Sequence, residues 1–178
     1  MESTPAILLR RTRFSETSLI VTWLTRDHGK LKTMARGVLR PKSPLAGALD
    51  LFFETEIAFV RSRRSEIHTL REVVLRNPFE GLRKDYARVE LAAYFVELLE
   101  AATEPEHPVP ELFDLLHRAL AYLETAAPSR RALLHFENEL ARLLGIHGEA
   151  GTGSAASALA RACSRLPSAR PGLLHKLP

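Results

Sequence analysis

The chain has 178 residues, 46% of them hydrophobic, so it can bury a core and is not disordered throughout. No apolar run reaches the roughly 18 residues that a membrane span needs, and no basic and apolar leader opens the sequence, so we expect a cytoplasmic protein. The only cysteine, Cys163, excludes an intramolecular disulfide and zinc sites of the four-cysteine or two-cysteine, two-histidine kind.

The net charge of +4 is distributed unevenly along the chain. Residues 1–80 contain 14 Lys and Arg against 9 Asp and Glu, a net charge of +5, whereas residues 81–150 contain 7 against 12, a net charge of −5. Residues 151–178 contain 4 basic residues and no acidic ones. This pattern indicates a basic module joined to a neutral or acidic one. A basic module is typical of proteins that bind a polyanion, but a solvated charged surface explains the charge equally well.

The first 78 residues have the pattern of short β-strands. Five segments rich in β-branched and aromatic residues or alternating in polarity are Ala6–Leu9, Ser18–Thr25, Lys30–Arg36, Phe52–Val60 and Ile67–Val73. The turn residues Asp27-His28-Gly29 join the second and third segments into a hairpin. Five short strands favour a small sandwich or barrel, and a five-stranded barrel of the OB type is a natural solution because closure removes the sheet edges.

After Asn77-Pro78 the apolar residues recur at helical spacing. Three amphipathic stripes, Leu82–Ala101, Leu112–Leu123 and Leu133–Leu144, are joined by short loops, and Gly145 is a candidate C-cap of the third. They predict an antiparallel helical bundle. The fold class is therefore α+β, with an OB-type β-barrel followed by an α-helical bundle domain.

The last part of the sequence is rich in Gly, Ala and Ser. We expect a flexible linker over residues 148–157, a short Ala-rich helix within 154–166 and an irregular tail over 167–178. The predicted domains are residues 1–78 for the barrel, 79–146 for the helical domain, and 147–178 for the linker, short helix and tail.

The sequence contains no catalytic or metal-binding pattern. The seven histidines lack metal-ligand spacing, and the glycines of residues 148–153 lack the preceding strand and following Gly-Lys-Ser/Thr of a phosphate loop. Cys163 is interpreted as a small packing residue rather than a nucleophile. Carboxylates of the predicted helices lie beside polar neighbours and are interpreted as a solvated face: Asp85, Glu90, Glu97, Glu137 and Glu139. We predict no enzyme activity, metal or cofactor.

Basic residues on the predicted strands and loops remain as the candidates for a function. Lys30 and Lys32 alternate on one strand, so their side chains share a face. The candidate DNA-binding residues are Arg10, Arg13, Lys30, Lys32, Arg36, Arg40, Lys42, Arg61, Arg63 and Arg64. For any single one a solvated charge is the favoured explanation, but for the cluster over residues 30–42 we favour phosphate binding. The aromatic residues Trp23, Phe52, Phe53 and Phe59 are expected in the core, so electrostatics should exceed base stacking.

The segment Ser15–Leu19 closely resembles the first hairpin of the RecO family of DNA repair and recombination mediators. Further matching motifs follow in the family's order: Gly29-Lys30, Ala35–Gly37, Arg40–Ser43, Gly47–Leu49, Leu70–Glu72, Tyr94–Leu98 and Phe136–Gly145. The resemblance covers residues 5–146, and it is the order and spacing of the motifs that make it specific.

The resemblance implies an OB barrel that binds single-stranded and double-stranded DNA and anneals complementary strands. It also implies a cytoplasmic, nucleoid-associated protein that contacts RecR and the acidic tail of single-stranded-DNA-binding protein, and acts indirectly on RecA after DNA damage. An acidic, Phe-ended tail needs an apolar groove with a basic rim. The candidate partner-binding residues are Phe113 and Leu116 for the floor and Arg130, Arg131 and Arg142 for the rim. Alternatively, these arginines balance local carboxylates.

Two departures from the family are visible in the sequence. Many members carry a four-cysteine zinc module after the third helix, where this chain has residues 148–157 and only Cys163 nearby. The chain also ends early, so we expect a shortened member without zinc. Two alternatives therefore stay open: an adaptor that docks proteins and has little DNA affinity, and an OB-type RNA-binding protein of translation.

Overall fold

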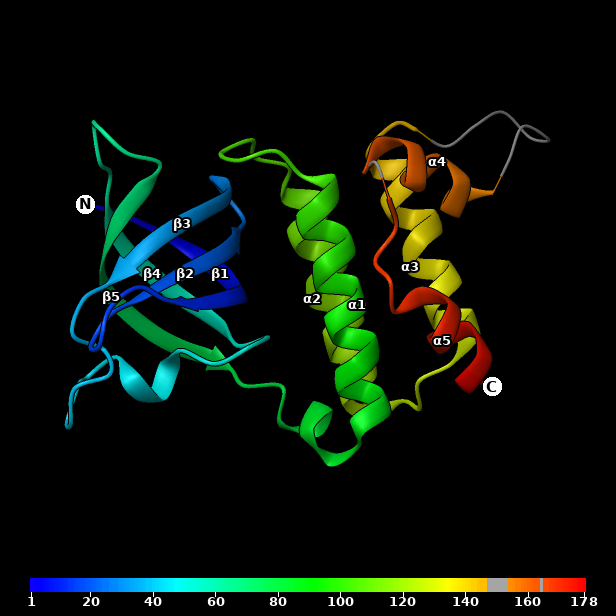
Figure 1. Ribbon diagram of the computed structural model, residues 1–178, viewed down its shortest axis with the longest axis horizontal. Coiled ribbons are helices and arrows are strands. Elements are labelled where there is room, and N and C mark those ends of the chain that lie inside the picture. The colour runs from blue at the N-terminus through cyan, green and yellow to red at the C-terminus, as the bar shows by residue number, and fades with distance from the viewer. Residues whose placement is uncertain (147–153, 164) are drawn as a thin grey trace. The chain divides into compact units, whose positions relative to one another are not determined.

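The computed structural model describes residues 1–146, 154–163 and 165–178 (Figure 1). They form two compact units. The first comprises Met1–Phe79 together with Glu104–Phe113, and the second comprises Glu80–Thr103 together with Asp114–Pro178. Among the described residues, no helix is both long and apolar enough to cross a membrane.

The first unit is a closed barrel of five strands in the order β1-β2-β3-β5-β4, which confirms the predicted OB-type barrel. The strands are β1 (Glu2–Arg13), β2 (Leu19–Thr25), β3 (Gly29–Ala35), β4 (Glu54–Val60) and β5 (Ile67–Asn77). Neighbouring strands are antiparallel except β3 and β5, which are parallel. A short 3-10 turn, η1 (Ala46–Ala48), lies between β3 and β4.

Strand β1 is longer than the predicted Ala6–Leu9 because it pairs on both sides. Residues 2–7 pair with β4, and residues 6–13 pair with β2, with a register shift between Leu8 and Arg10. A shift of this kind is a β-bulge, which bends a strand and increases its twist. The bend lets one strand close the barrel.

Alternate residues of the strands fill the barrel. Trp23 and Phe59 are fully buried, and Trp23 Nε1 donates a hydrogen bond to Thr33 Oγ1 at 2.8 Å. The indole N–H is therefore paired inside the apolar core, where an unpaired donor would be costly. Phe52 is also buried and Phe53 is half-buried, so the expected burial holds for three of the four aromatic side chains.

The segment Glu104–Phe113 is held against the barrel by a charged cluster. The backbone N–H of Glu106 donates to the carbonyl of Lys30 at 2.8 Å. The Glu106 carboxylate also contacts the guanidinium of Arg61 and lies 3.2 Å from Nε2 of His68. A Cβ at Gly29, where φ is +67°, would lie 2.3 Å from the backbone oxygen of His107, so the close approach requires glycine.

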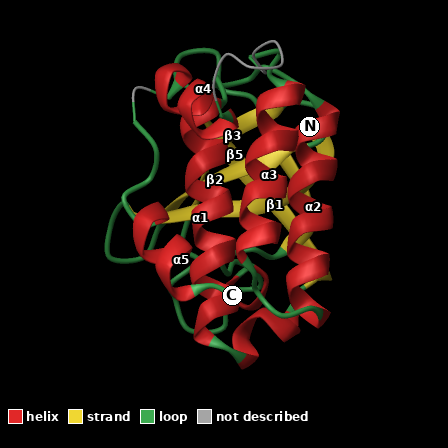
Figure 2. Cartoon of the chain, turned by 90° about the vertical axis from the view of Figure 1, so that its right-hand side faces the viewer, coloured by secondary structure: helices red, strands yellow, loops and turns green. Residues whose placement is uncertain are grey.

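The second unit is a helical bundle (Figure 2). Its helical elements are η2 (Glu80–Lys84), α1 (Tyr86–Ala102), α2 (Pro110–Thr125, whose first turn belongs to the barrel unit), α3 (Arg130–Leu143), α4 (Ala155–Ala162) and α5 (Arg170–Lys176). Asp85 caps α1 by accepting from the N–H of Ala87 at 2.9 Å, and Ser129 caps α3 through Ala132 at 3.2 Å. The three predicted amphipathic stripes thus form α1, α2 and α3.

The expected irregular tail over residues 167–178 is wrong, because α5 forms within it. Pro171 lies in the first turn of this helix, where proline lacks only an N–H that would be unpaired anyway. The expected linker falls partly on residues 147–153, which lie outside the described residues, but Ala155–Ser157 already belong to α4.

The expectation of a solvated Glu137 is also wrong. Its side chain is 1% exposed, and its carboxylate accepts from Nε and Nη2 of Arg170 at 2.6 and 2.8 Å. The hydroxyl of Tyr94 donates to the same carboxylate, and burial followed by this hydrogen bond raises the pKa of Tyr94. These contacts join α1, α3 and α5.

We predict that Arg170→Met lowers the free energy of unfolding by about 3 kcal/mol, because it leaves the Glu137 carboxylate buried and unpaired. Lys176→Met is the control in the same helix. It removes only the exposed ion pair with Glu90 and should change stability little. Urea unfolding of both variants measures the difference. Equal stabilities would show that the buried pair does not anchor α5.

Candidate functional site

Two turns of the barrel unit meet beside each other and form a hollow. The first, Phe14–Ser18, joins β1 to β2, and the second, Arg36–Arg40, follows β3. They are adjacent because Leu19 pairs with both Arg13 and Ala35. The hollow has a volume of about 490 Å³ and is lined by Phe14, Thr17, Ser18, Met34, Arg36, Gly37 and Arg40.

Hydrogen bonds tie the two turns together. The N–H of Leu39 donates to the carbonyl of Thr17 at 2.9 Å, and the N–H of Gly37 donates to Ser18 Oγ at 3.2 Å. Gly37 has a φ of +66°, a conformation that glycine adopts without strain. The turns are therefore one connected structure.

The candidate basic residues differ in exposure. Lys30 and Lys32 flank the buried Leu31 on β3, as their alternation predicts, but Lys30 is half-buried and Lys32 is exposed. Those exposed at the surface are Arg10, Arg13, Lys32, Arg36, Arg40, Lys42, Arg61, Arg63 and Arg64. Lys32 pairs in register with Ile67, so it lies beside the end of the turn that carries Arg63 and Arg64.

Arg13 and Arg61 bond to other residues of the barrel unit. Arg13 donates to the backbone oxygens of Ser15 and Glu16 at 3.3 and 3.4 Å and so supports the first turn. Arg61 donates from Nε to the Glu2 carboxylate at 2.9 Å, contacts Glu106 and lies over the ring of Phe59. We therefore interpret Arg61 as part of the barrel's own structure rather than as a phosphate ligand.

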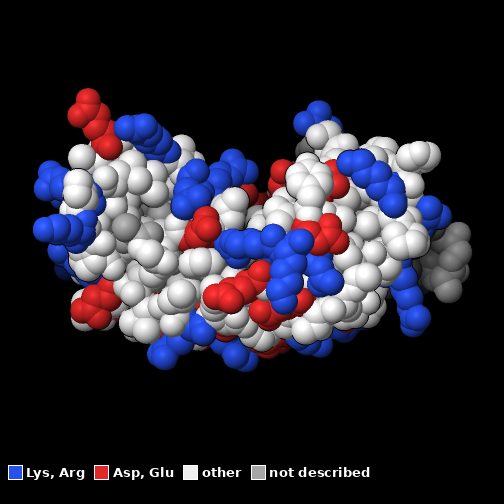
Figure 3. Space-filling view, turned by 90° about the horizontal axis from the view of Figure 1, so that it is seen from below, with Lys and Arg blue, Asp and Glu red and all other residues white. Residues whose placement is uncertain are grey.

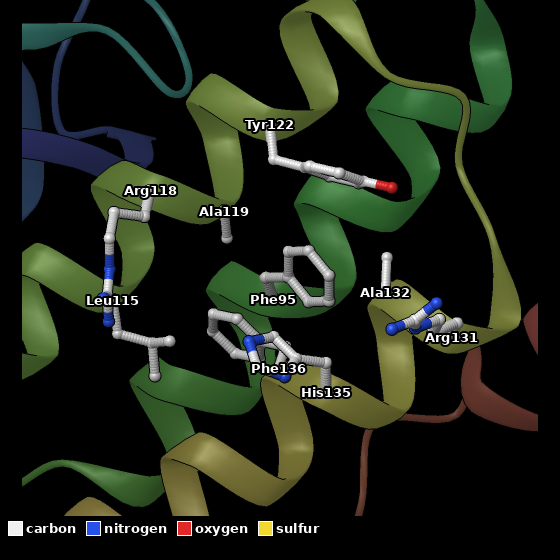
Figure 4. A pocket seen from close by; sticks show the side chains of 9 residues that line it. All are labelled: Phe95, Leu115, Arg118, Ala119, Tyr122, Arg131, Ala132, His135 and Phe136. Atoms are coloured by element: carbon white, nitrogen blue, oxygen red, sulfur yellow. The ribbon is translucent and has the colours of Figure 1, made fainter.

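The helical unit contains a second cavity, of about 570 Å³, between α1, α2 and α3 (Figure 4). Its centre is the stacked pair Phe95 and Phe136, whose ring centroids lie 4.1 Å apart. Arg118 and Arg131 approach from opposite sides, and the aromatic ring of Tyr122 lies above the stacked pair in Figure 4. The remaining lining residues are Leu115, Ala119, Ala132 and His135.

The predicted partner-binding residues are only partly brought together at this cavity. Arg131 lines it, whereas Phe113 and Leu116 are buried and do not line it, so this cavity does not support their predicted place in a groove floor. Arg130 donates to the backbone oxygen of Leu174 at 2.8 Å. Arg142 pairs with Glu139 at 2.9 Å, as the alternative of charge balance predicts.

Sequence reasoning missed Arg118, Tyr122 and Phe95 as lining residues. Phe95 lies on α1, and Arg118 and Tyr122 lie on α2. The sequence does not show which arginine of an amphipathic helix will line a cavity, because the cavity forms only when three helices pack together.

The described residues contain no group of three or more His, Cys, Asp or Glu side chains that could hold a metal ion. Cys163 is half-buried at the C-terminal end of α4, and burial raises the pKa of its thiol. A raised pKa disfavours the thiolate that a nucleophile needs, which agrees with its interpretation as a packing residue.

The chain is an α+β protein in which a closed OB-type barrel is followed by a helical bundle. Residues 1–79 match the family model "Recombination protein O N terminal", and residues 83–147 match "Recombination protein O C terminal". The chain belongs to the recombination protein O family.

Curated relatives carry the name DNA repair protein RecO. The protein of Rhodopirellula baltica is 36% identical over 140 residues, which are 79% of this chain and 52% of that protein. The protein of Syntrophus aciditrophicus is 32% identical over 142 residues, 80% of this chain and 55% of that protein. The protein of Salinibacter ruber is 35% identical over 144 residues with the same coverage. The chain thus spans about half the length of the curated relatives it matches.

We predict that Arg61→Ala lowers the free energy of unfolding by about 1 kcal/mol, because it removes two partly exposed ion pairs. Arg63→Ala, two residues further along the same turn, should change it by less than about 0.5 kcal/mol. Urea unfolding tests both. If Arg61→Ala is as stable as the wild type, the side chain is not structural and returns to the list of candidate DNA contacts.

Proposed function

We propose that the chain is a non-enzymatic mediator of DNA repair and recombination that binds single-stranded and double-stranded DNA through its barrel and anneals complementary strands. The observation that carries the proposal is the group of exposed basic side chains at, and just after, the second turn of an OB-type barrel: Arg36, Arg40 and Lys42. The name of the relatives, DNA repair protein RecO, supports the same role.

The charge of the two turns favours a polyanion. Residues 36–42 contain three basic residues and no acidic ones, and residues 14–18 contain only Glu16 as an acidic residue. Figure 3 shows one face of the molecule, with blue Lys and Arg side chains over the barrel on the left and fewer red carboxylates among them. Cations that neutralise phosphates release counterions, so binding is driven without base-specific contacts.

Annealing follows from the same electrostatics. Two complementary strands repel each other through their phosphates, and a protein that neutralises part of each strand lowers that repulsion. Contacts with RecR and an indirect effect on RecA remain part of the proposal, and they rest on the family alone.

A binding titration against salt tests the DNA face. We expect the triple variant Lys32→Ala, Arg36→Ala and Arg40→Ala to lower the salt slope for single-stranded DNA by about 2, at roughly 0.7 per phosphate contact. Affinity should fall for all base sequences alike, because phosphate contacts carry no sequence information. Duplex DNA should be affected as well.

The matched control removes three other exposed charges, Arg71, Arg76 and Lys84, and keeps the same net charge as the triple variant. Its salt slope should equal that of the wild type. If both variants behave alike, the effect comes from total charge and the DNA face lies elsewhere. An RNA oligonucleotide in the same titration tests the RNA-binding alternative, which a clear preference for RNA would support.

A second candidate function, docking of a protein tail, is favoured by the cavity of the helical unit. Its volume lies within the roughly 300–1,000 Å³ typical of ligand pockets. The Phe95 and Phe136 rings offer an apolar floor for an aromatic side chain, and Arg118 and Arg131 offer cations for carboxylates. This matches an acidic peptide that ends in phenylalanine, such as the tail of single-stranded-DNA-binding protein.

We predict that Arg118→Ala combined with Arg131→Ala weakens binding of an acidic, Phe-ended peptide by about tenfold or more, because both cations of the cavity rim are lost. Calorimetry with the peptide measures the change. Arg142→Ala is the control, since Arg142 pairs with Glu139 and does not line the cavity. Binding that survives the double variant but not the control would place the peptide elsewhere on α3.

A further inference from the structure

We propose that the hollow between the two barrel turns is a stacking subsite for an unpaired nucleobase, with the ring of Phe14 as its platform. This inference rests on the proposed DNA binding and goes beyond it. It predicts that one aromatic residue, which is not among the phosphate contacts, adds affinity for single strands only.

Phe14 is unusual because a large apolar ring is left in solvent. Its relative exposure is 62%, and it is the one exposed Phe, Tyr or Trp among the described residues of the barrel unit. Trp23 and Phe59, by contrast, are fully buried and are not available to a ligand. The expectation that electrostatics exceeds stacking in this barrel was based on Trp23, Phe52, Phe53 and Phe59 and did not include Phe14.

The turn that carries Phe14 is held in place before any ligand arrives. The N–H of Phe14 donates to the carbonyl of Ser18 at 3.0 Å, and Ser15 Oγ accepts from the N–H groups of Thr17 and Ser18 at 3.4 and 3.2 Å. The side chain of Arg13 supports the same turn by donating to the backbone oxygens of Ser15 and Glu16. A platform that is already ordered costs less entropy on binding than a mobile loop.

The surroundings of the ring match a nucleotide in particular. Phe14 shares the hollow with Met34 and with the exposed residues Arg36 and Arg40. A nucleotide has a flat apolar base and an anionic phosphate a few ångströms away. The base can stack on Phe14, and the phosphate can pair with Arg36 or Arg40. An apolar peptide would leave both arginines without a partner.

The geometry of DNA then makes the subsite selective. In a duplex, the faces of the bases are covered by their stacked neighbours, whereas a single strand can turn a base outward onto an aromatic ring. Phosphates are present in both forms. Phe14 should therefore contribute to binding of single strands only, and Arg36 and Arg40 to binding of both.

The test compares Phe14→Ala with the wild type on a single-stranded oligonucleotide and on a duplex of equal length. We expect single-strand affinity to fall about tenfold, duplex affinity to stay unchanged and the salt slope to stay unchanged, because a stacked base is lost and no phosphate contact is. Tyr86→Ala is the control, since Tyr86 is an exposed aromatic residue of the helical unit.

Two further measurements sharpen the test. The wild type should bind an oligonucleotide with abasic sites as weakly as Phe14→Ala binds the intact strand. Phe14→Trp should keep single-strand affinity, and its tryptophan fluorescence should be quenched by the single strand but not by the duplex.

The outcomes distinguish failure of the stacking subsite from failure of the proposed DNA binding. If Phe14→Ala binds single strands as the wild type does, or if it loses single strands and duplex equally, the stacking subsite is overturned while DNA binding stands. Absence of quenching in Phe14→Trp overturns it also. A wild type that binds neither form of DNA overturns the proposed function together with the subsite.

Discussion

Closure of the barrel by β1 is the constraint on which the candidate DNA face depends. This strand pairs with β4 through its first half and with β2 through its second, and the bulge between Leu8 and Arg10 lets it do both. The second half carries the chain to Arg13, opposite Leu19, and Leu19 in turn stands opposite Ala35. The turns after Arg13 and Ala35 are adjacent for this reason. A shift of one residue in either pairing would point Phe14 away from Arg36 and Arg40.

In the helical unit the corresponding constraint is the pair of Glu137 and Arg170. It lies inside the bundle and is shared by three helices, whereas the other ion pairs of α3 and α5 lie at the surface. Burial of two charges is favourable only when their geometry is good and the remaining oxygens are bonded, and Tyr94 supplies the third hydrogen bond. The cavity around Phe95 and Phe136 is shaped by the helices that this cluster holds.

Most of the fold can be predicted from the sequence, because alternation and helical periodicity are local properties. The five strands and the three long helices follow from them. Helix α5 could not be predicted, since Pro167, Pro171 and Gly172 are typical of irregular chain and the helix is stabilised by a partner 33 residues earlier. The exposure of Phe14 could not be predicted for a related reason. Whether an aromatic residue beside a turn lies in the core or in solvent depends on the closed barrel, and no local pattern distinguishes the two.

The segment Glu104–Phe113 has a consequence for how this family can vary. It comprises the loop after α1 and the first turn of α2, yet it belongs to the barrel unit, where it contacts Gly29, Arg61 and His68. A genetic exchange that joined one relative's barrel to another's helices near residue 79 would separate this segment from the barrel surface that it contacts. Substitutions at Glu106 should therefore co-vary with substitutions at Arg61 or His68 among relatives. The barrel and the helices should evolve together rather than be exchanged as independent modules.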